Sequence, residues 1–416
     1  MPDVFVARQP IFDLDNRLLG YELLYGSSGG ANGARRGLRG PRPSDTAVHA
    51  MIGIGVNRFA NGGVAFVDFT REFLLDSLHD LFEPGTLVVE VSEEARCDEE
   101  TLAACERLVR DGHRLALDAF SFTPGCEPLL RLAEIVKIDV RDRSAEELAD
   151  LSERLRPYDV RLLAHCVESD AVRDECARAG FELFQGYFFA RPELVAPRAL
   201  GDAQAAIVRM MNLLRDPAAT DAEVEQAFRA EPSLAHKLLC LANAAAPRGA
   251  AGAMDAGVDS VLVARHLVGR ETIAHWMALL LVSSLASGSA RDLELVRMSM
   301  VRGRMCELIA DERREASAPF LLAGLFSSLD ALLQAPMEEI LPRLRVAPAV
   351  REALLERRGP CADALELAEL YERGAWREMA AAAAHLGIPT LRVSQMYTDA
   401  LGWTRERLAR WERANG

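Results

Sequence analysis

The sequence lacks an excess of positive charge. Its 48 Lys and Arg residues are outnumbered by 62 Asp and Glu residues, which gives a formal net charge of −14 at pH 7. Proteins that bind nucleic acids need Lys and Arg clustered against the phosphate backbone. This charge balance therefore argues against a nucleic-acid-binding surface, and we expect no nucleic-acid partner.

Signals for export and for membrane insertion are also lacking. Residues 1–12 carry no basic start followed by an apolar core, so we expect no signal peptide. The longest nearly apolar run, 276–286, is too short to span a bilayer and predicts a buried helix. The eight cysteines form no C-x-x-C pair and no compact framework, which is typical of reduced thiols. We expect a cytoplasmic protein with no membrane association.

The first half of the sequence alternates short apolar, β-rich segments with amphipathic segments of helical length, such as Glu99–Asp111 and Ala145–Leu155. Repeated strand–helix units predict a parallel sheet with right-handed crossovers. Eight such strands in fewer than 200 residues favour a closed barrel over an open sheet, so we predict an α/β TIM-like barrel over residues 1–195. The predicted strands are Val4–Ala7, Leu18–Leu24, Gly63–Phe69, Leu87–Val91, Arg114–Asp118, Ile135–Asp139, Val160–Ala164 and Leu183–Phe188.

The pattern of the second half predicts consecutive helices that are separated by prolines and glycines. A chain of 416 residues is long enough for two domains, and we predict an all-α helical domain over residues 200–410, with the boundary near 193–203. The predicted helices include 205–214, 221–230, 234–246, 275–285, 293–310, 320–333, 364–373 and 376–386. Segment 26–43 is rich in glycine and arginine and predicts a flexible surface loop, with a basic phosphate-binding loop as the less favoured alternative.

Polar side chains stand where the predicted strands end. Functional residues of parallel barrels gather at this carboxyl-terminal face. Any one of them alone could be a solvated strand end, but several carboxylates with one lysine on one rim favour a hard-metal site, working or vestigial. The residues are Glu22, Asp68, Glu90, Asp118, Lys137, Asp139, Glu168 and Gln185.

Six ordered motifs resemble those of EAL-domain cyclic-di-GMP phosphodiesterases. They are GYELL (20–24), EVSE (90–93), LALDAF (115–120), VKID (136–139), AHCVE (164–168) and QGYFFARP (185–192). The opening ARQPIFD (7–13) is similar to the EAL subgroup that is fused to an HDOD domain. The resemblance covers roughly the first 190 residues and implies the TIM-like EAL barrel.

The resemblance also implies roles for individual residues. In that family two divalent metals polarise one phosphodiester and activate a water, and a lysine assists the water. The resemblance places Lys137 and Glu168 among the catalytic residues and Glu22 and Gln185 at the ligand. It places four residues at metal-ligand positions, with an aspartate where the family has an asparagine: Glu22, Asp68, Glu90 and Asp118.

Three departures from the family pattern weaken that chemistry. Ala119 replaces a carboxylate that serves the second metal, and His165 replaces a glutamate, although imidazole is a poor partner for Mg²⁺. Gly26 stands where an arginine would grip a phosphate. Two-metal catalysis needs both ions held close together, so we predict no useful phosphodiesterase activity. We expect no cofactor, with Mg²⁺ or Mn²⁺ only if the site still functions.

The helical half resembles the HDOD domain through LLRDP (213–217) and EPSLAHKLLCLANAA (231–245). That domain is related to metal-dependent HD phosphohydrolases, but Ser327 and Ser328 stand where the His-Asp metal dyad would be. His236, His266 and His275 have no paired carboxylate at ligand spacing. We therefore expect a non-catalytic domain that binds another signalling protein.

These observations favour a catalytically inactive EAL–HDOD signalling scaffold. Two alternatives stay open: a cyclic-di-GMP phosphodiesterase with an altered metal site, and a receptor that binds cyclic-di-GMP without cleaving it. The polar rim residues also have a structural explanation, because a buried carboxylate–lysine network can persist after catalysis is lost. A homodimer is implied by the resemblance alone.

Overall fold

The computed structural model describes residues 4–27, 60, 63–92, 98–118, 125–190, 201–231, 234–235, 238, 269–285 and 289–415. The chain divides into two compact units. The first comprises Met1–Arg191, Ser289–Glu294 and Glu366–Gly416, and the second comprises Pro192–Gly288 and Leu295–Leu365. The carboxyl-terminal helices therefore belong to the same unit as the barrel, whereas the domain boundary predicted near 193–203 lies mostly outside the described residues.

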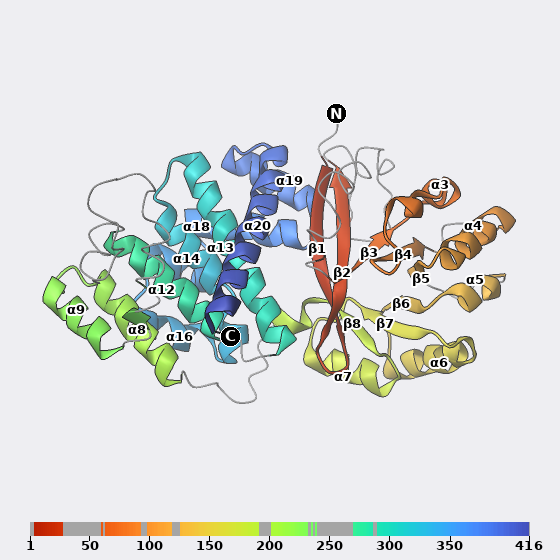
Figure 1. Ribbon diagram of the computed structural model, residues 1–416, viewed down its shortest axis with the longest axis horizontal. Helices are drawn as coiled ribbons and strands as arrows, with labels where there is room; N and C mark the ends of the chain where they lie inside the picture. Colours follow the sequence, from red (N-terminus) through yellow and green to blue (C-terminus); the bar gives the residue numbers. More distant parts are fainter. Residues whose placement is uncertain are drawn as a thin grey trace. The chain divides into compact units, whose positions relative to one another are not determined.

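Eight strands form a closed barrel in sequence order, which confirms the predicted TIM-like architecture (Figure 1). Each strand begins at the residue predicted for its start or one residue later. The strands are β1 (Val4–Asp13), β2 (Leu18–Ser27), β3 (Val64–Asp68), β4 (Leu87–Ser92), β5 (Arg114–Asp118), β6 (Ile135–Asp139), β7 (Arg161–His165) and β8 (Leu183–Gln185).

The prediction of an all-parallel sheet is wrong for β1. This strand is antiparallel to both of its neighbours, β2 and β8, while the other neighbouring strands are parallel. β1 and β2 are joined by a tight turn in which the Asp13 carboxylate accepts hydrogen bonds from the backbone N–H groups of Asp15 and Arg17. So short a connection can join only antiparallel strands. The predicted strand ended at Ala7, and this hid the hairpin.

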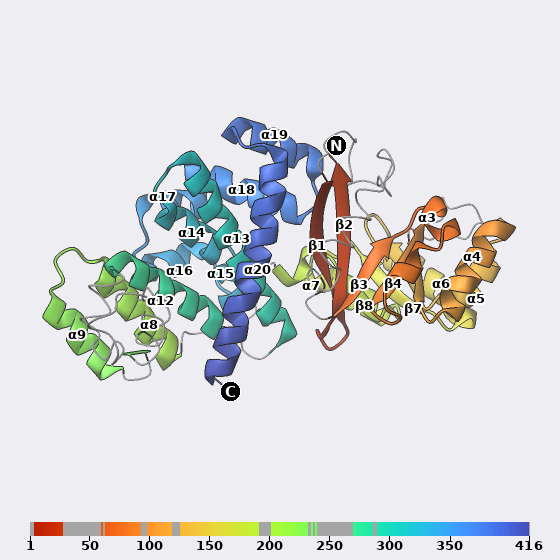
Figure 2. The same cartoon turned by 45° about the horizontal axis from the view of Figure 1, so that its top comes forward.

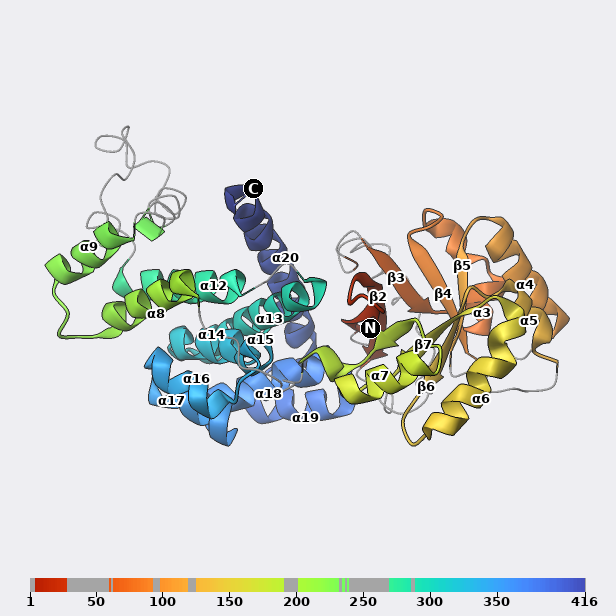
Figure 3. The ribbon, with the colours of Figure 1, turned by 90° about the horizontal axis from the view of Figure 1, so that it is seen from below.

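Amphipathic helices cover the outside of the strands. They are α3 (Arg71–Leu75), the 3-10 turn η1 (Leu78–Leu81), α4 (Glu99–Arg110), α5 (Glu127–Leu132), α6 (Ala145–Leu155) and α7 (Asp170–Arg178). The Asp98 side chain caps α4, and Ser144 with Glu147 forms a capping box at α6, which fixes where these two helices begin. Figure 3 shows α6 and α7 outside β6 and β7. The two barrel helices predicted from the sequence, 99–111 and 145–155, are thus confirmed.

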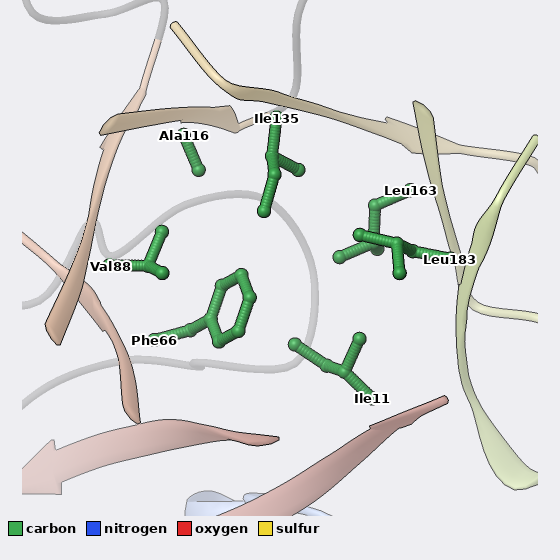
Figure 4. Close-up of a cluster of buried hydrophobic side chains, with 7 residues drawn as sticks. All are labelled: Ile11, Phe66, Val88, Ala116, Ile135, Leu163 and Leu183. Atoms are coloured by element: carbon green, nitrogen blue, oxygen red, sulfur yellow. The ribbon is translucent and has the colours of Figure 1, made fainter. Parts of the chain in front are cut away.

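Apolar side chains fill the middle of the barrel (Figure 4). Seven strands contribute one fully buried residue each: Ile11, Phe66, Val88, Ala116, Ile135, Leu163 and Leu183. Alternate residues of a strand point to the same face, so the residues two positions further toward the carboxyl ends of β3–β8 also point inward. On the antiparallel β1 the equivalent residue lies two positions before Ile11. This spacing places a second layer directly above the apolar one.

The carboxyl-terminal part of the barrel unit consists of the end of α18 (Pro360–Glu372), α19 (Trp376–Leu386) and α20 (Thr390–Asn415). These helices cover the β1–β2 hairpin, and α20 packs against β1 (Figure 2). The Trp376 indole N–H donates to the Tyr25 carbonyl at 3.0 Å. The Tyr371 hydroxyl accepts from the Val6 N–H at 3.3 Å and contacts the Val6 carbonyl at 3.4 Å. The hairpin is therefore held by aromatic side chains that are remote in the sequence.

The described elements of the second unit are all helical, which confirms the predicted helical region. They are α8 (Asp202–Arg215), α9 (Asp221–Ala230), α12 (Arg270–Ser284), most of α13 (Ala290–Arg313), α14 (Ser317–Phe326), α15 (Leu329–Leu333), α16 (Met337–Leu344), α17 (Pro348–Arg351) and the π-helical turn Glu352–Glu356. The predicted helix 320–333 is two helices, with the break at Ser327 and Ser328. The predicted helix 234–246 lies mostly outside the described residues. Among the described helices, none has an apolar stretch long enough to cross a bilayer.

α13 and α14 approach each other closely, because a Cβ on Gly324 would lie 2.5 Å from the backbone of Arg302. Only glycine permits this distance between the two helix backbones. α8 packs beside α12 (Figure 3).

Candidate functional site

A ring of polar side chains lies directly above the apolar layer of the barrel, and every strand contributes one member. We call it the inner polar ring: Gln9, Glu22, Asp68, Glu90, Asp118, Lys137, His165 and Gln185. Gln9 pairs with Glu22, Asp68 with Glu90, and His165 with Gln185 across neighbouring strands. Because strands rather than loops hold these residues, their positions are fixed by the barrel itself. Six of the eight predicted rim residues are therefore brought together.

Lys137 lies at the centre of the acidic residues of the ring. Its ammonium is 2.8 Å from Glu22 Oε1, 3.3 Å from Glu90 Oε1 and 3.7 Å from Asp118 Oδ1. The side chains of Lys137 and Glu90 are 1% and 0% exposed. A buried ammonium of this kind is stable only when opposite charges and hydrogen bonds replace its lost water. Lys137 is thus the internal counter-ion of the ring.

Gln185 connects the ring to β1. Its amide N–H₂ donates to Glu22 and, at 2.9 Å, to Gln9 Oε1. Two buried oxygens in this region have no hydrogen-bond partner among the described residues, namely Gln185 Oε1 and the Tyr25 hydroxyl. An unpaired buried polar atom costs free energy, so both atoms would gain from a bound water or cation.

The acidic residues of the ring have sharply different pKa values. Burial alone would raise the pKa of Glu22, but the Lys137 ammonium outweighs burial and lowers this pKa to about 2. Burial, together with repulsion from Asp118, raises the pKa of Asp68 to about 7. Burial also raises the pKa of Glu90 well above its usual value, despite Lys137. One lysine is therefore insufficient to compensate four carboxyl groups.

The excess of carboxyl groups over lysine in the ring favours binding of a hard cation. Glu22, Asp68 and Glu90 each offer a carboxylate oxygen, and these atoms lie within 4.8 Å of one another. Oxygen donors of this kind suit Mg²⁺, Mn²⁺ or Ca²⁺. The described residues thus fit one divalent ion. For a second ion they offer Asp118, which already contacts Lys137 at 3.7 Å, while Ala119 lies outside the described residues.

Two other predicted rim residues lie apart from this centre. Glu168 is exposed in the loop after β7, whereas the other carboxylates are buried or partly buried. Asp139 forms a charge-assisted pair with Arg141 on the surface. His165 belongs to the ring, and burial followed by the nearby Lys137 lowers its pKa, which favours the neutral imidazole.

Gly26 is the most informative of the predicted departures. A Cβ at this position would lie 2.4 Å from the Trp376 ring, far inside van der Waals contact. The Trp376 indole also donates its N–H to the carbonyl of the preceding residue, Tyr25. The space that any side chain at position 26 would enter is therefore filled by a tryptophan from α19.

The helical region carries an arginine near the position predicted for a lost metal dyad. Arg302 donates to Ser327 Oγ at 3.3 Å, and Ser327 donates to the Gly324 carbonyl at 2.8 Å. Ser328 is buried. A fixed guanidinium at this place disfavours a metal ion. His275 lies partly buried in α12, while His236 and His266 lie outside the described residues.

Two members of the site were missed by sequence reasoning. Gln9 belongs to the ring because β1 continues to Asp13, six residues beyond the end predicted for it. Continuing the alternation of β1 backward from Ile11 would have found it. Tyr25 lies close enough to Asp68 that this carboxylate, after burial, raises the pKa of the hydroxyl.

No family model matches the chain. It is 30% identical over 384 residues to the uncharacterized protein YuxH of Bacillus subtilis, covering 90% of this chain and 91% of YuxH. It is 28% identical over 422 residues to the protein named cyclic di-GMP phosphodiesterase CdgJ of Vibrio cholerae, covering 98% of this chain and 93% of CdgJ.

Among solved structures, the Bacillus subtilis YkuI protein, with an EAL domain and in complex with c-di-GMP and calcium, is 18% identical with a TM-score of 0.38, covering 56% of this chain and 72% of YkuI. The similarity to YuxH over nine-tenths of both chains decides the family. The chain belongs to the same family as YuxH, and its homologues include a protein named as a cyclic-di-GMP phosphodiesterase.

Proposed function

We propose that this chain is an EAL–HDOD signalling scaffold whose barrel does not bind cyclic-di-GMP and does not hydrolyse it at a useful rate. One observation carries the proposal: the Trp376 indole fills the space at Gly26, where the family resemblance expects a phosphate-binding arginine. An arginine grips a phosphate through two charge-assisted hydrogen bonds, and neither glycine nor an indole can replace them. The ring would therefore meet a nucleotide without that contact.

The protonation state of Lys137 supports the same proposal. Burial alone would lower the pKa of this lysine, but the surrounding carboxylates raise it well above its usual value, so the ammonium keeps its proton. A lysine held in this way donates hydrogen bonds and cannot act as a base toward water. Its contacts with Glu22 and Glu90 also engage two of the three carboxylates that would bind a cation.

If a divalent ion enters the ring, Glu22, Asp68 and Glu90 are the residues that would hold it. The ion would neutralise excess negative charge and could polarise a phosphoryl oxygen. Other residues of the ring position these ligands: Gln185 orients Glu22, and Lys137 holds Glu22 and Glu90 in place. This set fits one ion, whereas the family chemistry uses two.

A second candidate function is a cyclic-di-GMP phosphodiesterase with an altered metal site. The three convergent carboxylates favour it, as does the whole-length similarity to CdgJ. For the helical region we propose a non-catalytic HDOD-type module that binds a signalling protein. The Arg302–Ser327 contact, in place of a metal dyad, supports that role.

Titration calorimetry with cyclic-di-GMP in the presence of Mn²⁺ tests the proposal. We expect no binding by the wild-type protein or by Trp376→Ala. The double variant G26R/W376A, which removes the indole and supplies the arginine, should gain measurable affinity. Trp403→Ala is the matched control, because it removes a different, partly buried tryptophan from the carboxyl-terminal helices. Micromolar binding by the wild type would contradict the scaffold and favour a receptor or an enzyme.

A further inference from the structure

A second cluster of metal-binding side chains lies at the opposite end of the barrel from the inner polar ring. His79 and Asp80 belong to η1, which precedes β4, and Asp111 and His113 belong to the turn between α4 and β5. His113 directly precedes the first residue of β5, whereas the ring residue Asp118 is its last. We call these four residues the histidine–aspartate cluster.

The geometry of this cluster is unusual for hydrogen bonding. His79 Nε2 is 3.5 Å from Asp80 Oδ1 and 3.5 Å from Asp111 Oδ2. Both distances are at the outer limit for hydrogen bonds. They match the ligand–ligand spacing around a tetrahedral zinc ion, because bonds of about 2.0–2.2 Å place neighbouring ligands about 3.4 Å apart. One atom of each of the three residues lies within 4.8 Å of the others.

The histidines of the cluster are buried and incompletely satisfied. His79 is 0% and His113 5% exposed, and their rings meet edge to face with centroids 5.3 Å apart. The Nδ1 atom of each ring has no hydrogen-bond partner among the described residues. Leaving such nitrogens unpaired costs free energy, which a bound water would reduce.

Access to the cluster is open. The side chains of Asp80 and Asp111 are 65% and 49% exposed, so an ion can reach the buried imidazoles from solvent. The two connections run close together, because a Cβ added to Gly112 would lie 3.3 Å from Pro84. An ion bound here would join the segment before β4 to the turn before β5.

We propose that the histidine–aspartate cluster is a structural site for a zinc-class ion. His79 Nε2, Asp80 and Asp111 are its ligands, and water completes the coordination from the exposed side of the cluster. Imidazole with carboxylate suits Zn²⁺, whereas the oxygen-rich ring suits Mg²⁺ or Mn²⁺, so the two ends of the barrel differ in metal preference. An ion that binds only the folded chain stabilises it. This inference is independent of the function proposed for the ring.

Calorimetric titration of Zn²⁺ into tag-free, chelator-treated full-length protein, with Mg²⁺ present in excess, tests the site. The wild type should bind one Zn²⁺ tightly, and Asp111→Asn should weaken binding at least about 100-fold, since even second-shell changes cost about 10–100-fold. Asp111 is half exposed, so this variant should fold normally. Asp150→Asn, an exposed aspartate on α6, is the matched control and should bind as the wild type does.

Three further measurements test where the ion binds. Asp68→Asn, which alters the inner polar ring, should leave this Zn²⁺ affinity unchanged. Co²⁺ in place of Zn²⁺ should give visible ligand-field absorption that Asp111→Asn and His79→Gln abolish. Zn²⁺ should also raise the unfolding temperature of the wild type but not of Asp111→Asn. Wild-type affinity in Asp111→Asn, or loss of zinc binding in Asp68→Asn instead, would overturn the proposal.

Discussion

The two ends of the barrel each carry a cluster of potential metal ligands, and the two clusters differ in how they are held and in how their charge is balanced. The inner polar ring is held by strands, and it carries its own cation, Lys137, against four carboxyl groups. The histidine–aspartate cluster is held by a 3-10 turn and a helix–strand turn, with buried imidazoles and exposed carboxylates. The ring is thus fixed by the fold and partly neutralised from within, whereas the cluster has the geometry for an external ion. Similar ligand types therefore give two sites of different chemistry.

The largest effect should come from removing the ring's internal cation. Lys137→Met leaves the four carboxyl groups of the ring without their buried counter-ion, and breaking a buried pair in this way costs about 3–5 kcal/mol. Urea unfolding at neutral pH should show that loss in the free energy of unfolding. Arg141→Met is the control, because it breaks an exposed pair with Asp139 that contributes less than about 1 kcal/mol. Equal stability of the two variants would mean that the ring does not depend on Lys137.

A smaller effect distinguishes Asp68 from Glu22, because their ionised forms should change the stability of the folded state in opposite directions. The pKa of Asp68 is raised to about 7, so its ionised form destabilises the folded state. That cost is absent below about pH 4, where Asp68 is protonated in both states, and fully present above about pH 7. With a chelator present, Asp68→Asn should therefore raise the unfolding temperature at pH 8, with the gain vanishing toward pH 4.

Glu22 should respond in the opposite direction. Its pKa is lowered to about 2, so its ionised form adds stability that is present above about pH 4.5 and lost as the pH falls toward 2. Glu22→Gln should lower the unfolding temperature at pH 8. For domains of this size a change of about 1 kcal/mol moves that temperature by about 2–4 °C. Shifts of the same sign in both variants would contradict the charge balance described for the ring.

The strands and most of the ring could be predicted from the sequence because both follow local alternation. Apolar runs that end on a polar residue locate β3 to β6, and the same pattern locates Asp68, Glu90, Asp118 and Lys137. The antiparallel course of β1 and the ring member Gln9 were missed, because Pro10 and the polar Arg8 and Gln9 interrupt the apolar pattern of that strand.

Contacts between segments remote in the sequence could not be predicted. The hydrogen bond from Trp376 to Tyr25 joins residues 351 positions apart, and nothing near Gly26 indicates that an indole fills its space. The histidine–aspartate cluster likewise joins His79 to Asp111, 32 positions away, across two connecting segments. Such contacts depend on the tertiary packing of segments against one another rather than on a local motif.

Turnover of cyclic-di-GMP by the wild-type protein tests the central claim most directly. Purified protein is incubated with the nucleotide and either Mg²⁺ or Mn²⁺, and linear and mononucleotide products are separated by chromatography. We expect product no faster than with Glu90→Gln, in which a ring carboxylate is neutralised. Hydrolysis at an ordinary enzymatic rate of about 1 s⁻¹ or more, abolished by Glu90→Gln, would contradict the scaffold and establish the phosphodiesterase.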